Sequence, residues 1–233
     1  STDFTANDIS TTGGSITSFS GSGTSYTATF TPDDDSNTDG VISVSSPKFT
    51  DAAGNANTAG SITLAVDTVE PTINITSDVS ELKVGETAQL TFTLSESSTD
   101  FTAEDISATG GTISDFSGSG TSYTATFTPT DDSNTDGVIS VSSDKFTDAA
   151  GNANNAASNT VTLTVDTVEP TITIASNVSE LKVGETATLT ITLSEASTDF
   201  VLEDITATGG SITSFSGSGT SYTATFTPED NLT

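Results

Sequence analysis

One segment of thirteen residues occurs three times in this chain of 233 residues. It reads Ser-Gly-Ser-Gly-Thr-Ser-Tyr-Thr-Ala-Thr-Phe-Thr-Pro and lies at 20–32, 117–129 and 216–228, so that its copies are 97 and then 99 residues apart. A second motif, Val-Asp-Thr-Val-Glu-Pro, begins at Val66 and again 99 residues later at Val165. A period near 100 residues is too long for a solenoid repeat and fits a small independent domain. The sequence therefore predicts a tandem array of similar domains.

The second motif marks the joints between these domains. Division there gives a partial repeat over 1–66 that lacks its first strands, a complete repeat over 67–165, and a partial repeat over 166–233 that lacks its last strands. An incomplete domain would expose its core to water. We therefore expect the parent protein to continue in both directions, with neighbouring repeats of the same chain as each domain's partners.

Apolar residues alternate with polar ones throughout the complete repeat, which is the pattern of half-buried strands. Gly110-Gly111 predicts a two-residue hairpin turn, and Gly118 to Gly120 a second turn. Seven short strands are expected around the following inward-facing residues: Ile73, Ile75, Ala88, Leu90, Phe92, Leu94, Ile106, Ala108, Ile113, Phe116, Tyr123, Ala125, Phe127, Ile139, Val141, Val161, Leu163 and Val165.

Seven strands in about 100 residues, without any helical period, predict an all-β fold: tandem two-sheet sandwiches of the immunoglobulin type in an extended array. The disulfide and tryptophan that often fill such a core are absent, because the chain has no Cys and no Trp. Phenylalanine and isoleucine must therefore fill it.

The charge of the chain excludes several functions. Its 32 Asp and Glu face only four lysines, giving a net charge of −28. Nothing here neutralises phosphates, so we expect no nucleic-acid partner, and no apolar run has the length for direct membrane insertion. The chain lacks His, Cys and Arg, which leaves no base–nucleophile pair to propose, so we predict that it is not an enzyme.

Strand order places the acidic loops at the two ends of each sandwich. The N-terminal end of the complete repeat gathers the linker residues Asp67 and Glu70 with the loops 95–100 and 148–154. The C-terminal end gathers the loops 77–86 and 130–137. Where one repeat follows another, carboxylates from several loops should converge around the linker. Carboxylates that close repel each other by about 1 kcal/mol per pair in water, and the few lysines offer little compensation.

Hard oxygen ligands without imidazole or thiolate suit Ca²⁺. The sequence Asp-Ser-Asn-Thr-Asp-Gly at 35–40 and 132–137 matches the first half of a calcium-binding loop, although it lacks the bidentate glutamate of an EF-hand. The predicted calcium ligands are Asp35, Asn37, Asp39, Asp67, Glu70, Asp100, Asp132, Asn134, Asp136, Asp148, Asp166 and Glu169.

Simpler interpretations exist for the same residues. Asp, Asn and Gly are ordinary turn residues, so either acidic loop is also consistent with a solvated turn. Asp-Ala-Ala-Gly-Asn, at 51–55 and 148–152, would serve equally as a long turn capped by its Asp and Asn. Glu70-Pro71 would serve to stiffen the entry into the next strand.

The repeated segment at 20–32, the sequence Phe-Thr-Asp-Ala-Ala-Gly-Asn-Ala-Asn at 49–57 and the joint motif together resemble the bacterial Ig-like repeats of giant surface adhesins. These are RTX-type, type I-secreted proteins of Gram-negative bacteria, which include biofilm and ice-binding adhesins. The resemblance implies a secreted, cell-surface extender: many copies in series, rigidified by calcium at the linkers, that carry a ligand-binding tip away from the cell. It points to Asp67 and Asp166, together with the loops of Asp136 and Asp148, as calcium ligands.

A binding module is the alternative function, an Ig-like domain that recognises glycan, ice or itself directly. Outward threonine pairs, such as Thr91 with Thr93 or Thr162 with Thr164, offer a polar contact face. Threonine is also simply a favourable exposed strand residue. Isopeptide bonds from Lys48, Lys83, Lys145 or Lys182 to asparagine are a further alternative, but the sequences around these lysines are typical of solvated strand ends.

Overall fold

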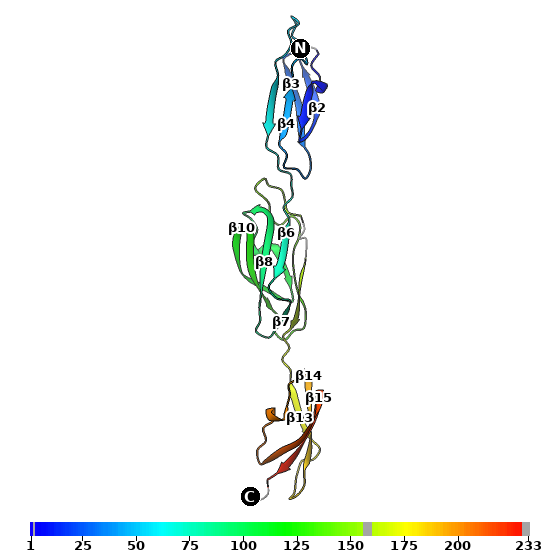
Figure 1. Cartoon of the computed structure of the whole chain (residues 1–233), viewed down its shortest axis with the longest axis vertical. Helices are drawn as coiled ribbons and strands as arrows, with labels where there is room; N and C mark the ends of the chain where they lie inside the picture. Colours follow the sequence, from blue (N-terminus) through cyan, green and yellow to red (C-terminus); the bar gives the residue numbers. More distant parts are fainter. Residues whose placement is uncertain (2, 156–159, 230–233) are drawn as a thin grey trace. The chain divides into compact units, whose positions relative to one another are not determined.

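The computed structural model describes residues 1, 3–155 and 160–229. The chain divides into two compact units, Ser1–Thr167 and Val168–Thr233. Over the described residues the regular structure is β-strand apart from three single-turn 3-10 helices (Figure 1). No helix in these residues is long and apolar enough to cross a membrane. The structure confirms the predicted all-β fold of tandem sandwiches.

The second repeat is a complete two-sheet sandwich, with β6, β8 and β10 side by side in one layer (Figure 1). The pairs are antiparallel except β7 with β12, which is parallel. The first sheet has the order β10 (Gly111–Pro129), β8 (Ala88–Ser98), β6 (Ile73–Ser77). The second sheet has the order β7 (Glu81–Lys83), β12 (Val161–Asp166), β11 (Gly137–Val141), β9 (Ile106–Thr109). The 3-10 helix η2 (Ala103–Asp105) precedes β9.

One strand of this sandwich was not predicted. The short β7 contributes only Leu82 to the core, where this side chain is 2% exposed. A strand of three residues with one buried side chain leaves no alternating pattern to detect, which is why the sequence did not indicate it.

The predicted hairpin at Gly110-Gly111 is wrong. β9 pairs with β11 in one sheet and β10 pairs with β8 in the other, so the chain crosses between sheets at this point. Gly110 has φ +73, and a Cβ there would lie 2.3 Å from the Asp136 carbonyl oxygen. At Gly111 a Cβ would lie 2.3 Å from the Thr128 carbonyl and 2.5 Å from the Phe127 ring. The glycines are therefore required by a tight corner between sheets.

The predicted turn at Gly118 to Gly120 lies inside β10, which folds back on itself. Gly118 and Gly120 have φ values of +132 and +66, and the hydroxyls of Ser117 and Thr124 lie 3.2 Å apart across the two arms. The first repeat carries the same hairpin as two separate strands, β2 (Gly14–Ser22) and β3 (Ser25–Pro32).

Aromatic rings fill the core in place of a disulfide and tryptophan, as predicted. Phe101 lies at the centre, and its ring centroid is 5.1–5.8 Å from four others. These neighbours are Phe92, Phe116, Tyr123 and Phe146. The Tyr123 hydroxyl donates a 2.8 Å hydrogen bond to the Ser98 carbonyl, so that its one polar atom is satisfied inside the core.

The other two repeats contain parts of the same sandwich. The first has a sheet in the order β1 (Ile9–Thr12), β4 (Gly40–Val44), β5 (Gly60–Leu64), beside the pair β2–β3, with η1 (Ala6–Asp8) before β1. The third has one sheet in the order β13 (Ile172–Ser176), β14 (Ala187–Ser197), β15 (Gly210–Pro228), with η3 (Leu202–Asp204) before β15.

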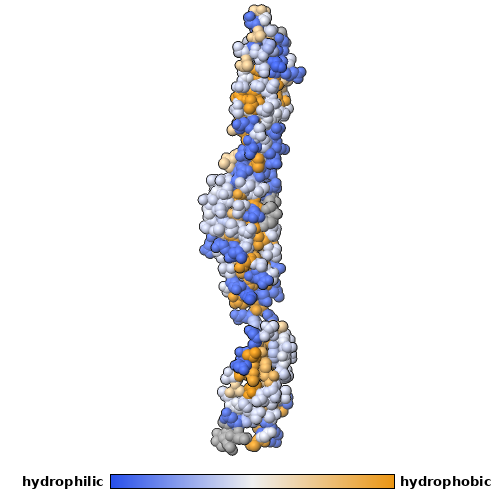
Figure 2. Space-filling view, in the orientation of Figure 1, coloured by the Kyte–Doolittle hydropathy of each residue, from blue (hydrophilic) through white to orange (hydrophobic). Residues whose placement is uncertain are grey.

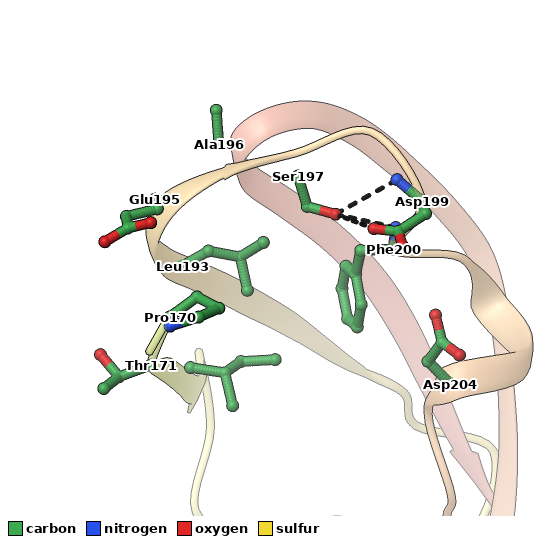
Figure 3. Close-up of a pocket in the computed structure, with 10 residues that line it drawn as sticks. Pro170, Thr171, Leu193, Glu195, Ala196, Ser197, Asp199, Phe200 and Asp204 are labelled. Atoms are coloured by element: carbon green, nitrogen blue, oxygen red, sulfur yellow. Dashed lines mark hydrogen bonds between the residues drawn. The ribbon is translucent and has the colours of Figure 1, made fainter. Parts of the chain in front are cut away.

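Hydrophobic residues are visible at the surface of the third repeat (Figure 2). Ile172 and Ile174 are 49% and 56% exposed there, whereas the equivalent Ile73 and Ile75 of the second repeat are 1% and 0% exposed. Leu193 and Phe200 border an open pocket whose rim includes Glu195 (Figure 3). Residues 205–208, which are equivalent to β9, form no strand. In the second repeat β9 pairs with β11, and the described residues of the third repeat contain no strand equivalent to β11.

These equivalent isoleucines allow a matched test of burial. Ile75→Ala should lower the free energy of unfolding of the second repeat by about 2–5 kcal/mol, because it removes fully buried methyl groups and leaves a cavity. Ile174→Ala should change the stability of the third repeat by less than about 0.5 kcal/mol. Urea unfolding followed through the amide NMR signals of each repeat measures both, and equal effects at the two positions would contradict the assigned packing.

Candidate metal site at the first joint

The linker between the first and second repeats is hydrogen-bonded to the second repeat at Asp67, Pro71 and Thr72. The Asn152 side-chain amide donates to the Asp67 carbonyl at 3.1 Å. The Asn155 amide donates to the Pro71 carbonyl at 3.0 Å, and the Ser95 amide donates to the Thr72 carbonyl at 2.9 Å. These bonds fix Asp67 beside the end of β8 and the loop that follows β11.

Three carboxylates meet at this place. Asp67, Glu96 and Asp148 each offer an oxygen, and these oxygens lie within 4.8 Å of one another. Asp67 is exposed, Glu96 is half-buried and Asp148 is buried. The sequence predicted that the linker and the loops 95–100 and 148–154 share one end of the sandwich, and the structure confirms this convergence.

Asp148 is held in place by its own loop. One carboxylate oxygen accepts the backbone amides of Ala150, Gly151 and Asn152 at 2.7–2.9 Å, and the other accepts the Asn152 side chain at 2.8 Å. Burial raises the pKa of Asp148, but these hydrogen bonds outweigh burial and bring the pKa below its ordinary value. The turn-capping interpretation of this loop is therefore correct, and the same residue also belongs to the acidic cluster.

Glu96 has the opposite shift. Partial burial raises its pKa, and the negative charges of Asp67 and Asp148 raise it further. The cluster thus contains one carboxyl group whose pKa is lowered and one whose pKa is raised. A perturbed pair of carboxyl groups of this kind is common at functional sites.

The donor set fits a hard divalent cation. Three carboxylates supply oxygen ligands only, which suits Ca²⁺, and Asp148 is already oriented by four hydrogen bonds before any ion arrives. Asp67, Glu96 and Asp148 would hold the ion, with the further oxygens that Ca²⁺ requires coming from water or backbone. A bound cation would replace the mutual repulsion of the carboxylates with attraction.

Asp100, another predicted ligand, is hydrogen-bonded to other residues of the second repeat. Its carboxylate accepts the Ser98 hydroxyl at 2.6 Å, the Thr147 amide at 2.9 Å and the Thr147 hydroxyl at 2.9 Å. Burial raises its pKa, but these hydrogen bonds outweigh burial and lower it below the ordinary value. Asp100 therefore ties the end of β8 to the loop after β11. Asp3 makes the same bonds to Thr50 in the first repeat.

The two Asp-Ser-Asn-Thr-Asp-Gly loops lie at the C-terminal ends of the first and second repeats. Their acidic and amide residues are exposed: Asp35, Asn37, Asp39, Asp132, Asn134 and Asp136. Asp35 and Asp132 have φ values of +51 and +52, a left-handed conformation that Asp tolerates better than most residues. Among the described residues, only Asp67, Glu96 and Asp148 form a group of three close carboxylates. Calcium ligation by these two loops stays a prediction.

The remaining predicted ligands lie along the linkers. Glu70 is exposed and lines a groove with Asp34, Asp35 and Thr68. Asp166, the last residue of β12, occupies the position equivalent to Asp67, and the exposed Glu169 is equivalent to Glu70. Metal binding by these residues also stays a prediction.

Glu96 was not among the predicted ligands, although its loop was. Asp100 was the predicted ligand from that loop. The structure shows that β8 continues through Ser98, which places Glu96 beside the linker and turns Asp100 toward Thr147. The neighbouring Ser95 side chain accepts the Thr72 amide at 2.8 Å, a contact that no pattern in the sequence indicated.

The fold and the joints define a class of protein: a series of immunoglobulin-type sandwiches connected through acidic linkers. A family model described as a bacterial Ig-like domain matches residues 1–66, 67–165 and 166–233. The chain therefore belongs to the bacterial Ig-like domain family. No curated protein matches it.

The raised pKa of Glu96 generates a test in the presence of a chelator. The pKa of Glu96 is higher in the folded state than in the unfolded state. Ionised Glu96 therefore lowers the stability of the fold at pH values above its folded pKa, and this loss of stability is absent below the unfolded pKa. Glu96→Gln should therefore be more stable than wild type at pH 7, by up to about 1 kcal/mol. The difference should vanish as the pH falls below about 4.

Thermal melts of both proteins from pH 7 to pH 3 measure this difference, with the exposed Glu104→Gln as the matched control. A Glu96→Gln variant that is less stable than wild type at pH 7 in chelator would contradict the repulsion ascribed to the cluster.

Proposed function

We propose that this chain is a calcium-rigidified extender region of a bacterial cell-surface adhesin, an array that projects a ligand-binding tip from the cell. The observation that carries the proposal is the acidic cluster of Asp67, Glu96 and Asp148, which combines a linker residue with the end of β8 and the loop after β11 of the following repeat. A cation bound there would tie the linker to that repeat.

Membership of the bacterial Ig-like family supports the first part of the proposal, since the family model matches three successive ranges of the chain. Sandwiches in series form a spacer, because each domain has its own core and contributes length. In this role the chain would be secreted to the cell surface, and the groups that recognise a target would lie elsewhere in the parent protein.

Electrostatics supports the second part. A chain with a net charge of −28 repels itself at every joint where acidic loops meet. Extracellular Ca²⁺ is in the millimolar range that fills sites with dissociation constants of about 10⁻⁴ to 10⁻³ M. Each bound ion would then lower the repulsion and add stability by mass action.

Calcium should therefore raise the melting temperature of the wild-type chain and narrow the range of conformations around the first joint. At a concentration 100-fold above the dissociation constant the gain is about 2.7 kcal/mol. Asp67→Asn should weaken calcium binding by about tenfold or more, because it removes one charged ligand from the linker. Isothermal titration calorimetry and thermal melts, with Asp131→Asn on an exposed loop as control, measure both effects.

The extender function is contradicted if millimolar calcium changes neither the melting temperature nor the small-angle scattering profile relative to chelator. Glycan-array binding by this chain would instead favour the alternative of a direct recognition module.

A further inference from the structure

Thr68, next to Asp67 in the linker, is bonded to the preceding repeat. Its amide donates to the Ser36 carbonyl at 2.9 Å. Its hydroxyl oxygen accepts the Ser36 amide at 3.0 Å, and its hydroxyl proton has two acceptors, the Asp33 carbonyl at 2.8 Å and the Ser36 carbonyl at 3.1 Å. Thr68 thus both donates hydrogen bonds to the loop after β3 and accepts one from it.

The next linker repeats this arrangement atom for atom. The Thr167 amide donates to the Ser133 carbonyl at 2.9 Å, and the Thr167 hydroxyl accepts the Ser133 amide at 3.0 Å. The hydroxyl proton again has two carbonyl acceptors, of Thr130 at 2.7 Å and Ser133 at 3.0 Å. Thr167 is 4% exposed, which is unusual for a threonine in a linker. Buried and fully hydrogen-bonded, it occupies a specific place on the loop.

Two aspartates with a left-handed backbone conformation shape the loops that bind these threonines. Asp35 and Asp132 turn the chain at positive φ just before Ser36 and Ser133. Each serine hydroxyl then accepts the amide two residues later at 3.1 Å. The backbone amide and carbonyl of the serine therefore remain available to the linker threonine. These aspartates have a structural role in the turn whether or not they bind an ion.

Adjacent linker residues therefore face different repeats. The Asp67 carbonyl accepts Asn152 and its carboxylate joins Glu96 and Asp148, all in the second repeat. Thr68 bonds only to Asp33 and Ser36 of the first repeat in the hydrogen bonds described above. The peptide unit that joins Asp67 to Thr68 is thus bonded to both repeats, because its carbonyl accepts Asn152 of the second repeat and its amide donates to Ser36 of the first.

We propose that Thr68, and Thr167 at the next joint, is a metal-independent latch that fixes the linker to the preceding repeat. Thr68 is a positioning residue and not a calcium ligand. A cation at Asp67 fixes the linker to the following repeat only, and the latch transmits that order to the preceding one. This second step rests on the calcium-binding function proposed above, whereas the latch itself does not.

Amide hydrogen exchange in the presence of chelator tests the latch directly. The amides of Ser36 and Thr68 should be protected equally with and without calcium in the wild-type chain, which requires no variant. Thr68→Val keeps the shape but removes every hydrogen bond of the hydroxyl, so the Ser36 amide should exchange about five- to tenfold faster or more. Thr68→Ser should restore protection, and the exposed Thr29→Val should have no effect. Protection of Ser36 that depends on calcium, or that survives Thr68→Val, overturns the latch.

A second measurement separates the latch from the metal site. The chain has no cysteine, so Thr63→Cys and Thr162→Cys allow one spin label in each of the first two repeats. Calcium should narrow the distance distribution between these labels in the otherwise wild-type chain. With Thr68→Val added, calcium should bind with an affinity within about tenfold of wild type, yet the distribution should stay as broad as in chelator.

Asp67→Asn should show the converse behaviour, weak calcium binding with the Ser36 and Thr68 amides still protected. If the distance distribution of the Thr68→Val variant narrows with calcium as that of wild type does, the latch does not couple the two repeats and the proposal fails. If the wild-type chain itself binds no calcium, the proposed function fails, while the exchange result still decides whether the latch exists.

Discussion

Burial of apolar side chains between two sheets is the interaction on which the rest of this structure depends. In the second repeat it gathers four aromatic rings around Phe101 and leaves Phe92 and Phe127 without exposed surface. Only when both sheets are present do the end of β8 and the loop after β11 lie at one end of the sandwich. The acidic cluster is thus a consequence of core packing. Asp100 reinforces it, because its bonds to Thr147 tie those two segments together.

Charge is the second constraint, and it acts where packing ends. The strands carry threonine and serine outward, and most carboxylates lie in loops and linkers. Two kinds of interaction at the first joint oppose the resulting repulsion between carboxylates. Neutral hydrogen bonds from Thr68 and Asn152 hold the linker without any ion, and three carboxylates form a place where a cation would be attracted. Partial burial raises the pKa of Glu96, and the negative charges of Asp67 and Asp148 raise it further.

Much of the architecture was predictable from the sequence, because alternation and repetition are local or periodic signals. The strands, the aromatic core and the meeting of three acidic segments at one end of the sandwich all followed from residue order. The crossing at Gly110-Gly111 was mistaken for a hairpin, because a glycine pair marks a tight turn without indicating which strands it joins. β7 was too short to leave a pattern.

The identity of the clustered carboxylates depended on finer geometry. Choosing Glu96 over Asp100 required knowing that β8 extends to Ser98, and strand ends are poorly marked in sequence. The acidic loops at 35–40 and 132–137 were interpreted through their Asp and Asn side chains. Their backbone, presented by Ser36 and Ser133, makes the contacts to Thr68 and Thr167 that the structure describes. A threonine in a linker carries no motif that would reveal this role.

The central claim is that a cation binds among Asp67, Glu96 and Asp148. The most direct measurement replaces calcium with the paramagnetic lanthanide Gd³⁺ and maps the broadening of amide NMR signals at substoichiometric ion. The account predicts that Asp67, Glu96 and the amides of residues 149–152 broaden first, and that a diamagnetic lanthanide leaves the same signals sharp. Broadening that begins at 35–39 or 132–136, or that spreads evenly over the acidic loops, would contradict it.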